Sequence, residues 1–288
     1  MIYLSWSLYA AAWLAVALVF LFAAKKLFDL LTSYSLEVQL TEKDNPAIGL
    51  ILSGFLIGVA AIICGAFSGE GSNEVSIALF LSEIGGVALY VTIGMALLFF
   101  AGIVNDKLVL HSFCSQHEVV EERNMGVAAI TTSAYISSGL IIGGGITGSF
   151  SLETILLPFI AGQVGLVLFA LFYQKLTSYD DQKEIGEKKN TAAGVAFAGN
   201  LLAYGIVLMK GVSMGDEGME MPIDRLWHFL YYAIIGCILL ALVRGVTDRV
   251  FLPKEKLSKE IVEDQNLSAG FVEAGLALAV SAVLVVCL

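Results

Sequence analysis

The sequence predicts an all-α membrane protein built from eight transmembrane helices, and three observations predict this class. Apolar residues make up 58% of the 288 residues and charged residues only 15%, whereas soluble domains hold about 45–50% and about 25%. Eight apolar runs are each long enough to cross a bilayer, which takes about 20 residues. The same short motif precedes every second run.

The charge composition excludes one class of partner. The formal net charge is −10, and the chain holds only 16 Lys and Arg. A protein that binds nucleic acid needs a basic surface to meet the phosphates, so we expect no nucleic-acid partner. The lipid bilayer is the partner that the composition predicts.

The eight apolar runs follow one another along the whole chain. They cover residues 8–31, 46–67, 84–104, 125–148, 152–173, 191–212, 226–246 and 268–288. The first run has no basic residue before it and contains Lys25 and Lys26 near its end, an order opposite to that of a secretory signal peptide. We therefore expect this run to remain as a membrane anchor.

The basic residues predict an orientation. The connections after the first, third, fifth and seventh runs, with their membrane edges, hold 14 of the 16 Lys and Arg. Lys and Arg concentrate in cytoplasmic loops, so these four connections are predicted to be cytoplasmic. An even number of spans then places both termini outside.

The sequence also repeats itself. Residues 31–34, Leu-Thr-Ser-Tyr, recur at 176–179, and Asp106 recurs as Asp248 with similar surroundings. Such self-similarity predicts tandem structural units. The predicted units are residues 1–145 and 146–288. Because each unit holds an even number of spans, the two copies run in the same direction through the membrane, unlike inverted transporter repeats.

A shorter repeat divides each unit into two helical hairpins. Every predicted cytoplasmic connection ends in Glu-x-x-Asn, and small residues follow two and four positions after the asparagine. The glutamates are Glu42, Glu121, Glu187 and Glu263, and the asparagines are Asn45, Asn124, Asn190 and Asn266. The chain is thus predicted to be four helical hairpins in series.

Two interpretations of this motif stay open. Helix capping explains it, because an N-cap Asn accepts a hydrogen bond from a free amide and a nearby acid offsets the positive helix end. Alternatively, the four glutamates form the cytoplasmic mouth of a path, as carboxylate rings do in cation-selective pores. Helix amino ends also attract anions, which argues against the second interpretation.

The repeated Glu-x-x-Asn-x-small-x-small signature resembles the YjfL family of bacterial inner-membrane proteins, a domain of unknown function usually present as one four-span copy. Two tandem copies cover nearly the whole chain here. The resemblance implies a bacterial cytoplasmic membrane location, and a link to envelope-stress proteins of the phage-shock type and to ATP-grasp ligases similar to glutathionylspermidine synthetase. It implies no catalytic residues, because the family has no established activity.

Small residues predict which helices are central. Gly, Ala, Ser and Thr occupy 43 of 89 positions in the even runs and 24 of 88 in the odd runs. Small residues mark helix faces that pack closely in membranes. We therefore expect the even helices to form a pseudo-fourfold inner bundle and the odd helices to face lipid.

Polar residues on the even runs are candidates for a water-lined path, among them Asn200. Hydrogen bonds to the same or a neighbouring helix explain them equally well. Glu273 lies seven residues after Asn266, about 10 Å along the helix, where a carboxylate is costly and needs a partner. The other hairpins hold Leu52, Thr131 and Phe197 at this position. A packed, protonated or snorkelling acid is the alternative.

The remaining motifs predict no chemistry. Arg244 and Asp248 are one helical turn apart and are expected to pair at the membrane interface. His111, Cys114 and His117 lack the fourth ligand of a structural zinc site, so we expect no metal. Because no phosphate loop, zinc-protease motif or nucleophile elbow is present, we expect no cofactor and no enzyme.

Two functional hypotheses follow. The first is a conduit for ions or a small polar solute between the even helices, with the four glutamates at its mouth and Glu273 and Asn200 along it. The second is a non-catalytic membrane scaffold whose cytoplasmic loops, especially 105–124 and 247–266, bind a peripheral protein of the phage-shock type. Association into a homo-oligomer is left open by the sequence.

Overall fold

Every regular element in the described part of the chain is a helix. The structure is a computed structural model, and it describes residues 2–68, 77–146, 151–213, 222–251 and 255–288. The long helices are α1 (Ile2–Leu31), α2 (Pro46–Phe67), α3 (Ile77–Val104), α5 (Met125–Ile146), α6 (Leu152–Leu176), α7 (Thr191–Val212), α8 (Pro222–Val246) and α10 (Leu267–Cys287). All eight are long and apolar enough to cross a membrane, which confirms the predicted class.

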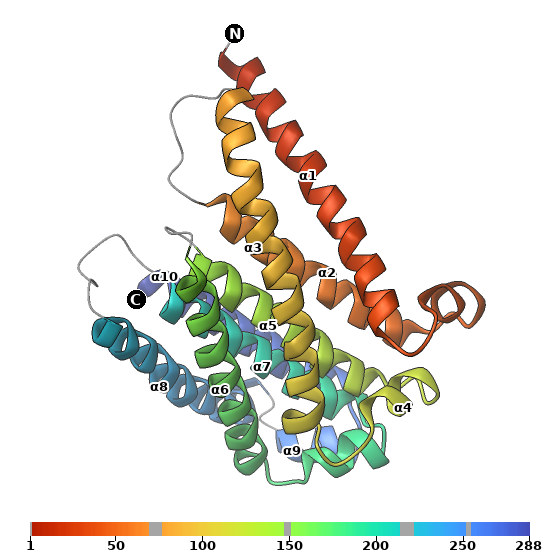
Figure 1. The fold of residues 1–288 in the computed structure, drawn as a ribbon. Helices are drawn as coiled ribbons and strands as arrows, with labels where there is room; N and C mark the ends of the chain where they lie inside the picture. Colours follow the sequence, from red (N-terminus) through yellow and green to blue (C-terminus); the bar gives the residue numbers. More distant parts are fainter. Residues whose placement is uncertain (1, 69–76, 147–150, 214–221, 252–254) are drawn as a thin grey trace.

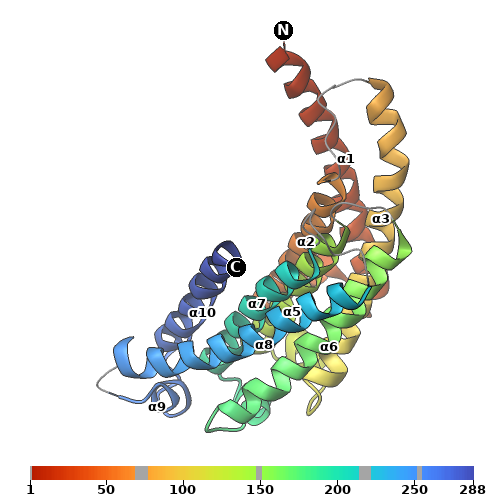
Figure 2. The same ribbon diagram turned by 90° about the vertical axis from the view of Figure 1, so that its left-hand side faces the viewer.

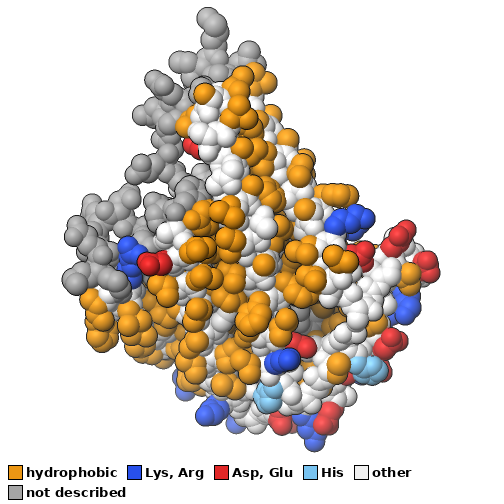
Figure 3. Space-filling view, in the orientation of Figure 1, with side chains coloured by type: hydrophobic (Ala, Val, Ile, Leu, Met, Phe, Trp, Pro, Cys, Tyr) orange, Lys and Arg blue, Asp and Glu red, His pale blue; other side chains and the backbone are white. Residues whose placement is uncertain are grey.

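Short helical turns join the long helices at one end of the molecule. They are the π-type turns η1 (Val38–Glu42), η2 (Asn105–Val109), η3 (Lys183–Glu187) and η4 (Thr247–Phe251), and the short helices α4 (Ser115–Val120) and α9 (Leu257–Val262). Figure 3 shows that charged side chains gather at this end, whereas apolar side chains cover the long helices above it. We call it the loop end; it contains the connections predicted to be cytoplasmic.

The four even helices pack in a row. The row runs α2, α5, α7, α10, each helix lying against the next, and α2 and α10 stand at its two ends (Figures 1 and 2). The two middle helices are the most buried. In an 18-residue apolar stretch of each helix, 72% of the residues of α5 and 78% of those of α7 lie inside the protein. Small residues let these backbones approach closely, as expected for helices packed in lipid.

The odd helices lie outside this row. The helix α6 packs on both α5 and α7, so it covers the groove between two inner helices, and α3 packs on both α2 and α5 in the same manner. The expectation of a pseudo-fourfold inner bundle is wrong for a single chain, because the row is open. Counting small residues identified α2, α5 and α7 correctly as inner helices, but it carried no information about closure.

Candidate functional site

The four asparagines of the repeated motif cap the inner helices, and the first three also link their hairpin to the next. The side-chain oxygen of Asn124 accepts hydrogen bonds from the amides of Gly126 and Val127, at 3.0 and 3.2 Å. Its amide nitrogen donates to the carbonyl of Ile185 in the following hairpin, at 2.8 Å. Asn45 and Asn190 donate likewise to the carbonyls of Val119 and Ile261. The motif therefore caps a helix and also joins two hairpins.

The four glutamates of the motif do not meet. Each is exposed at the loop end of its own hairpin, and because the hairpins follow an open row, the side chains lie along a line rather than around a mouth. In the last three hairpins a different acid lies nearer the cap, because the asparagine amides donate to Glu118, Glu184 and Glu260. In the first hairpin Asn45 donates instead to Gln39. The structure thus brings together the caps but not a carboxylate ring.

The seams between the inner helices are closed by backbone packing. A β-carbon added to Gly54 would lie 2.7 Å from a methyl carbon of Thr132, and one on Gly58 would lie 2.7 Å from the carbonyl oxygen of Tyr135. A β-carbon on Gly194 would overlap the backbone of Gly126. Contacts this close leave no room for water. The path that we expected between the even helices is therefore not open along these seams.

Glu273 lies instead in a cluster of polar side chains from four helices of the second repeat. Its Oε1 accepts hydrogen bonds from the hydroxyl of Tyr173 (2.9 Å) and the amide of Asn200 (3.1 Å), and it forms an ion pair with Arg244. Arg244 also donates to the Tyr173 hydroxyl, at 2.8 Å. Glu273 is only 1% exposed, and a buried carboxylate needs a counter-ion. Arg244 provides this counter-ion.

The expected pairing of Arg244 with Asp248 is wrong. Asp248 accepts a hydrogen bond from the backbone amide of Leu257, at 2.7 Å, and so holds the start of α9. Arg244 points into the cluster, where a buried carboxylate offers a stronger partner than a solvated one. Helical spacing alone could not distinguish these two acids.

A second acid, Asp181, lies at the loop end of the same cluster. Burial raises the pKa of Asp181 from 3.8 to about 7, while the Thr177 hydroxyl and the charge of Arg244 partly oppose this rise. Burial likewise raises the pKa of the neighbouring Tyr179. Oδ1 of Asp181 and Oε2 of Glu273 are buried and accept no hydrogen bond from the described residues. Buried oxygens of this kind usually bind water or a ligand.

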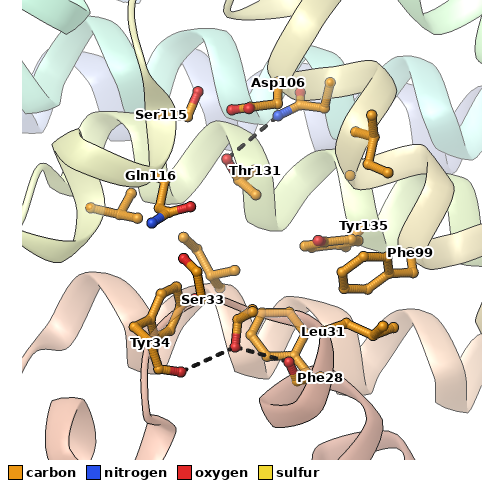
Figure 4. A pocket seen from close by; sticks show the side chains of 16 residues that line it. Phe28, Leu31, Ser33, Tyr34, Phe99, Asp106, Ser115, Gln116, Thr131 and Tyr135 are labelled. Carbon is orange, nitrogen blue, oxygen red and sulfur yellow. Dashed lines mark hydrogen bonds between the residues drawn. The ribbon is translucent and has the colours of Figure 1, made fainter.

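The first repeat has a cavity between its two hairpins at the loop end. Its volume is about 350 Å³, within the range of small-molecule sites. Figure 4 shows Phe28 and Tyr34 on one wall and Asp106, Thr131 and Tyr135 on the other. Burial raises the pKa of Tyr34 to about 12, so its hydroxyl stays neutral and can donate a hydrogen bond. We call this cavity the first-repeat pocket.

The first-repeat pocket and the charge cluster occupy equivalent places in the two repeats. Phe28 and Tyr34 of the pocket align with Tyr173 and Tyr179 of the cluster. Three further pairs differ in charge: Gly102 stands where the second repeat has Arg244, Thr131 where it has Glu273, and Leu36 where it has Asp181. In the first repeat the Tyr135 ring reaches Gly102. One repeat thus fills this place with an ion pair, whereas the other leaves a cavity.

Sequence reasoning found part of these sites. Glu273 and Asn200 were identified as polar residues in spans, and the structure brings them into contact. Tyr173, Asp181 and the role of Arg244 were missed. A signal was available in the alignment of the two repeats. Arg244 and Asp181 are charged, whereas the residues at the equivalent positions of the first repeat, Gly102 and Leu36, are uncharged.

Comparison with known proteins agrees with the repeated architecture. The sequence profile of the family described as "Domain of Unknown Function (DUF350)" matches residues 3–146 and again residues 148–288. The chain is also 25% identical over 134 residues to a protein described as "UPF0719 transmembrane protein" from Aquifex aeolicus (strain VF5). That match covers 46% of this chain and 47% of the relative, so the alignment spans about half of the relative's length. No solved structure matches the chain significantly. The chain therefore belongs to the DUF350 family, as a multi-pass membrane protein with two tandem copies of the family's domain.

Proposed function

We propose that this protein provides a path for a small cation of the ammonium type, which it binds at the first-repeat pocket from the loop end. The pocket is the observation that carries this proposal. It combines one acid, Asp106, with four aromatic side chains that line it: Phe28, Tyr34, Phe99 and Tyr135. A carboxylate beside aromatic faces is the arrangement that favours an organic ammonium ion, through charge and cation–π attraction.

The acid in the pocket is available to a ligand. Asp106 makes no hydrogen bond to any described residue, whereas its equivalent Asp248 is occupied by the amide of Leu257. Two further oxygens that are buried beside it, Oδ1 of Asn105 and Oγ of Ser115, accept no hydrogen bond from the described residues either. Three oxygen acceptors around one cavity suit a ligand that carries N–H donors and a positive charge.

The equivalent cluster in the second repeat supports the same chemistry. There a guanidinium, itself a cation with N–H donors, lies between Glu273 and the ring of Tyr173, its carbon 5.2 Å from the ring centroid. The second repeat thus holds a cation beside Tyr173, whose equivalent Phe28 lines the first-repeat pocket.

Binding and flux in lipid vesicles test this proposal. We would reconstitute the purified protein and measure thermal stabilisation by methylammonium and tetramethylammonium, with acetate as the anionic probe, and then uptake of radiolabelled methylammonium under an inside-negative potential. Asp106→Asn should weaken methylammonium binding at least tenfold, because a hydrogen bond to a charged group contributes about 1.5–3 kcal/mol. Tetramethylammonium has no N–H, so it measures the charge and ring contacts alone.

The matched control is Glu37→Gln, which removes an exposed acid outside the pocket and should leave binding unchanged. Acetate should not stabilise the protein. The proposal fails if neither cation binds, or if Asp106→Asn and Glu37→Gln bind the cations equally well.

A non-catalytic scaffold is the second function that we propose, and it rests on the closed seams together with the exposed glutamates. Glu42, Glu121, Glu187 and Glu263 are all exposed at the loop end, where a peripheral protein of the phage-shock type can reach them. Neutralising all four should abolish capture of such a partner from native membranes while cation binding persists. If cation binding is lost and the partner is retained, the scaffold hypothesis is wrong.

The orientation forms part of the proposal. We place the loop end in the cytoplasm of a bacterium and both termini outside the inner membrane. The loop-end connections, with their membrane edges, hold 14 of the 16 basic residues, and Lys and Arg concentrate in cytoplasmic loops. A reporter enzyme that is active only outside the cytoplasm, fused after residue 288, should be active. The same enzyme inserted between residues 111 and 112, which are both exposed at the loop end, should be inactive.

A further inference from the structure

The two ends of the helix row are unlike each other, and each lacks a neighbour that the inner contacts supply. To compare the inner helices we count positions from the capping asparagine, so that +9 is Gly54, Ser133, Gly199 or Gly275. The trailing face, which each inner helix turns to the next, contains positions +2, +6, +9 and +13. The leading face, which it turns to the preceding helix, contains +4, +8 and +15.

The trailing face is buried on the first three inner helices and exposed on the fourth, α10. All twelve trailing residues of α2, α5 and α7 are buried: Ala47, Ile51, Gly54, Gly58, Gly126, Ile130, Ser133, Ser137, Ala192, Ala196, Gly199 and Ala203. On α10 the same four positions are all exposed: Ser268, Val272, Gly275 and Ala279. At +2, +9 and +13 these residues are small like their counterparts, whereas lipid-facing positions of the outer helices hold large side chains such as Leu168 and Leu242. Small residues indicate packing against another helix.

The leading face shows the complementary pattern. Its residues on α5, α7 and α10 are all buried: Ala128, Thr132, Gly139, Gly194, Ala198, Gly205, Gly270, Ala274 and Ser281. On α2 the corresponding residues are half-buried or exposed: Gly49, Ser53 and Ala60. The exposed leading face of α2 is therefore the kind of surface on which a trailing face packs. The exposed trailing face of α10 is the kind of surface on which a leading face packs.

The hydrogen bonds between hairpins end at the same edges. Asn45, Asn124 and Asn190 each donate to the carbonyl that lies five residues before the next asparagine. Asn266 donates to Glu260 within its own hairpin and to no carbonyl of another hairpin among the described residues. The equivalent carbonyl on the first hairpin is that of Leu40. One donor and one acceptor of the series are thus left at opposite ends of the row.

The outer helix α1 also lacks the groove that its equivalent occupies. The helix α6, which is equivalent to α1, packs on α7 of its own hairpin and on the preceding inner helix, α5. In an 18-residue apolar stretch of α6, 44% of the residues are buried. For α1 only 6% is buried, because no inner helix precedes α2. A helix placed against the leading face of α2 would provide the second wall of this groove.

We infer that a second copy of this chain supplies that helix, its α10 packing against α2 in the way that α7 packs against α10. The contact is head-to-tail, with the amide of Asn266 facing the Leu40 carbonyl of the next copy. Because such an interface joins two different surfaces, repetition gives a ring or an extended row in the membrane plane. The inference is independent of the proposed cation path, since the first-repeat pocket lies within one chain.

A disulfide tests the register of this contact. In the inner seams position +20 meets +19 of the next helix, as Gly65 meets Gly143 and Gly144 meets Met209. At the junction between copies these positions are Val286 and Cys64, and Cys64 is exposed in the single chain. Backbones this close are within reach of a disulfide.

The variant Val286→Cys, with Cys114, Cys237 and Cys287 replaced by Ser, should form disulfide-linked dimers and higher multimers in oxidised membranes. Cys64→Ser should abolish them. The control Leu157→Cys places a thiol on an exposed site of the outer helix α6 in the same background and should form none. Linkage through Cys64 of both copies would overturn the head-to-tail arrangement, and so would the absence of any link.

A packing variant tests the same contact without cysteine. A β-carbon on Gly275 meets nothing within 4 Å, so Gly275→Leu leaves the single chain intact but adds bulk where inner helices touch. It should shift the mass in lipid nanodiscs from multimers to monomers. Gly85→Leu, at another open glycine, should leave the mass unchanged. A wild type that is monomeric in lipid at every concentration would overturn the inference.

A charge variant should strengthen the contact. Between the second and third hairpins Lys189 pairs with Glu122, whereas the equivalent residues at the junction between copies are Asp44 and Asp264, two like charges. Asp44 has a positive φ of 48°, as Lys189 has one of 54°, so lysine is tolerated in this backbone. Asp44→Lys should tighten association about two- to fivefold, and Asp44→Lys combined with Asp264→Lys should cancel the gain. Weaker association of Asp44→Lys would contradict the register.

Discussion

The carboxylate of Glu273 on α10 pairs with the guanidinium of Arg244 on α8, 29 residues earlier in the chain. Both side chains lie inside the protein, 1% and 12% exposed. Tyr173 of α6 and Asn200 of α7 donate to the same oxygen of Glu273. Four helices of the second repeat thus converge on one carboxylate, and the pair holds outer helices to inner ones.

Removing one charge of this pair should destabilise the protein strongly. Glu273→Gln leaves Arg244 buried without its counter-ion, so we expect a loss of about 3–5 kcal/mol in the free energy of unfolding. The measurement is thermal unfolding in detergent micelles. Arg244→Met combined with Glu273→Leu should recover most of the loss, because the packed volume is kept and no charge is left unpaired. A double variant as unstable as the two single losses added together would contradict this account.

The stability of the protein should depend on Asp181 and on pH. The folded-state pKa of Asp181 is raised from 3.8 to about 7, so the folded chain holds this proton more tightly than the unfolded chain does. The contribution of Asp181 to stability is therefore greatest below about pH 4 and declines as the pH rises through about 7. Its upper limit is about 4 kcal/mol, since one pKa unit corresponds to about 1.4 kcal/mol.

Asp181→Asn should accordingly raise the melting temperature at pH 8 and change it little at pH 4. The ionisable groups that face Asp181 are Arg244, Glu273 and Asp180. Asp180→Asn is the control, because Asp180 is exposed. Equal effects of Asp181→Asn at pH 4 and pH 8 would show that this acid does not titrate in the range given.

The capping asparagines should differ in importance according to their second hydrogen bond. Asn124→Ala removes the helix cap and the link to Ile185, with an expected loss of about 2–3 kcal/mol. Asn266→Ala in monomeric protein removes the cap and a bond within its own hairpin, with an expected loss of about 1–2 kcal/mol. Asn124→Asp keeps the cap oxygen and loses the amide bonds to Ile185 and Glu118, so it separates the amide donor from the cap. Equal losses for both alanine variants would contradict a linking role.

Glycines at the seam should tolerate no added carbon, whereas the glycine on the open face should. Gly194→Ala places a methyl group against the backbone of Gly126, and such overpacking costs about 1–3 kcal/mol. Gly275→Ala meets open space and should stabilise α10 by up to about 1 kcal/mol, since alanine is the better helix former. Unfolding of the two variants in detergent compares them directly. A neutral Gly194→Ala would mean that the seam is looser than described.

The helices themselves are determined locally, and the sequence therefore predicts them well. Apolar runs of membrane length, the N-cap asparagines Asn45, Asn124, Asn190 and Asn266, and the tandem repeat are all confirmed by the structure or the family match. Each depends on residues close together in the chain, where the rules of capping and helix length act directly. The small residues likewise identified α2, α5 and α7 as inner helices.

Only the tertiary structure decided which surfaces meet. Helical spacing pairs Arg244 with Asp248, but packing brings it to Glu273. Equivalent positions of the two repeats carry similar sequences, yet only the second repeat forms the buried ion pair, because Gly102 and Thr131 stand in the first repeat where the second has Arg244 and Glu273. Ser268, Gly275 and Ala279 are small and predict a close helix contact, but they do not say with which helix. Within the described part of one chain, nothing lies within 4 Å of a β-carbon added to Gly275. Contacts between distant segments depend on how all helices pack at once, which no local pattern specifies.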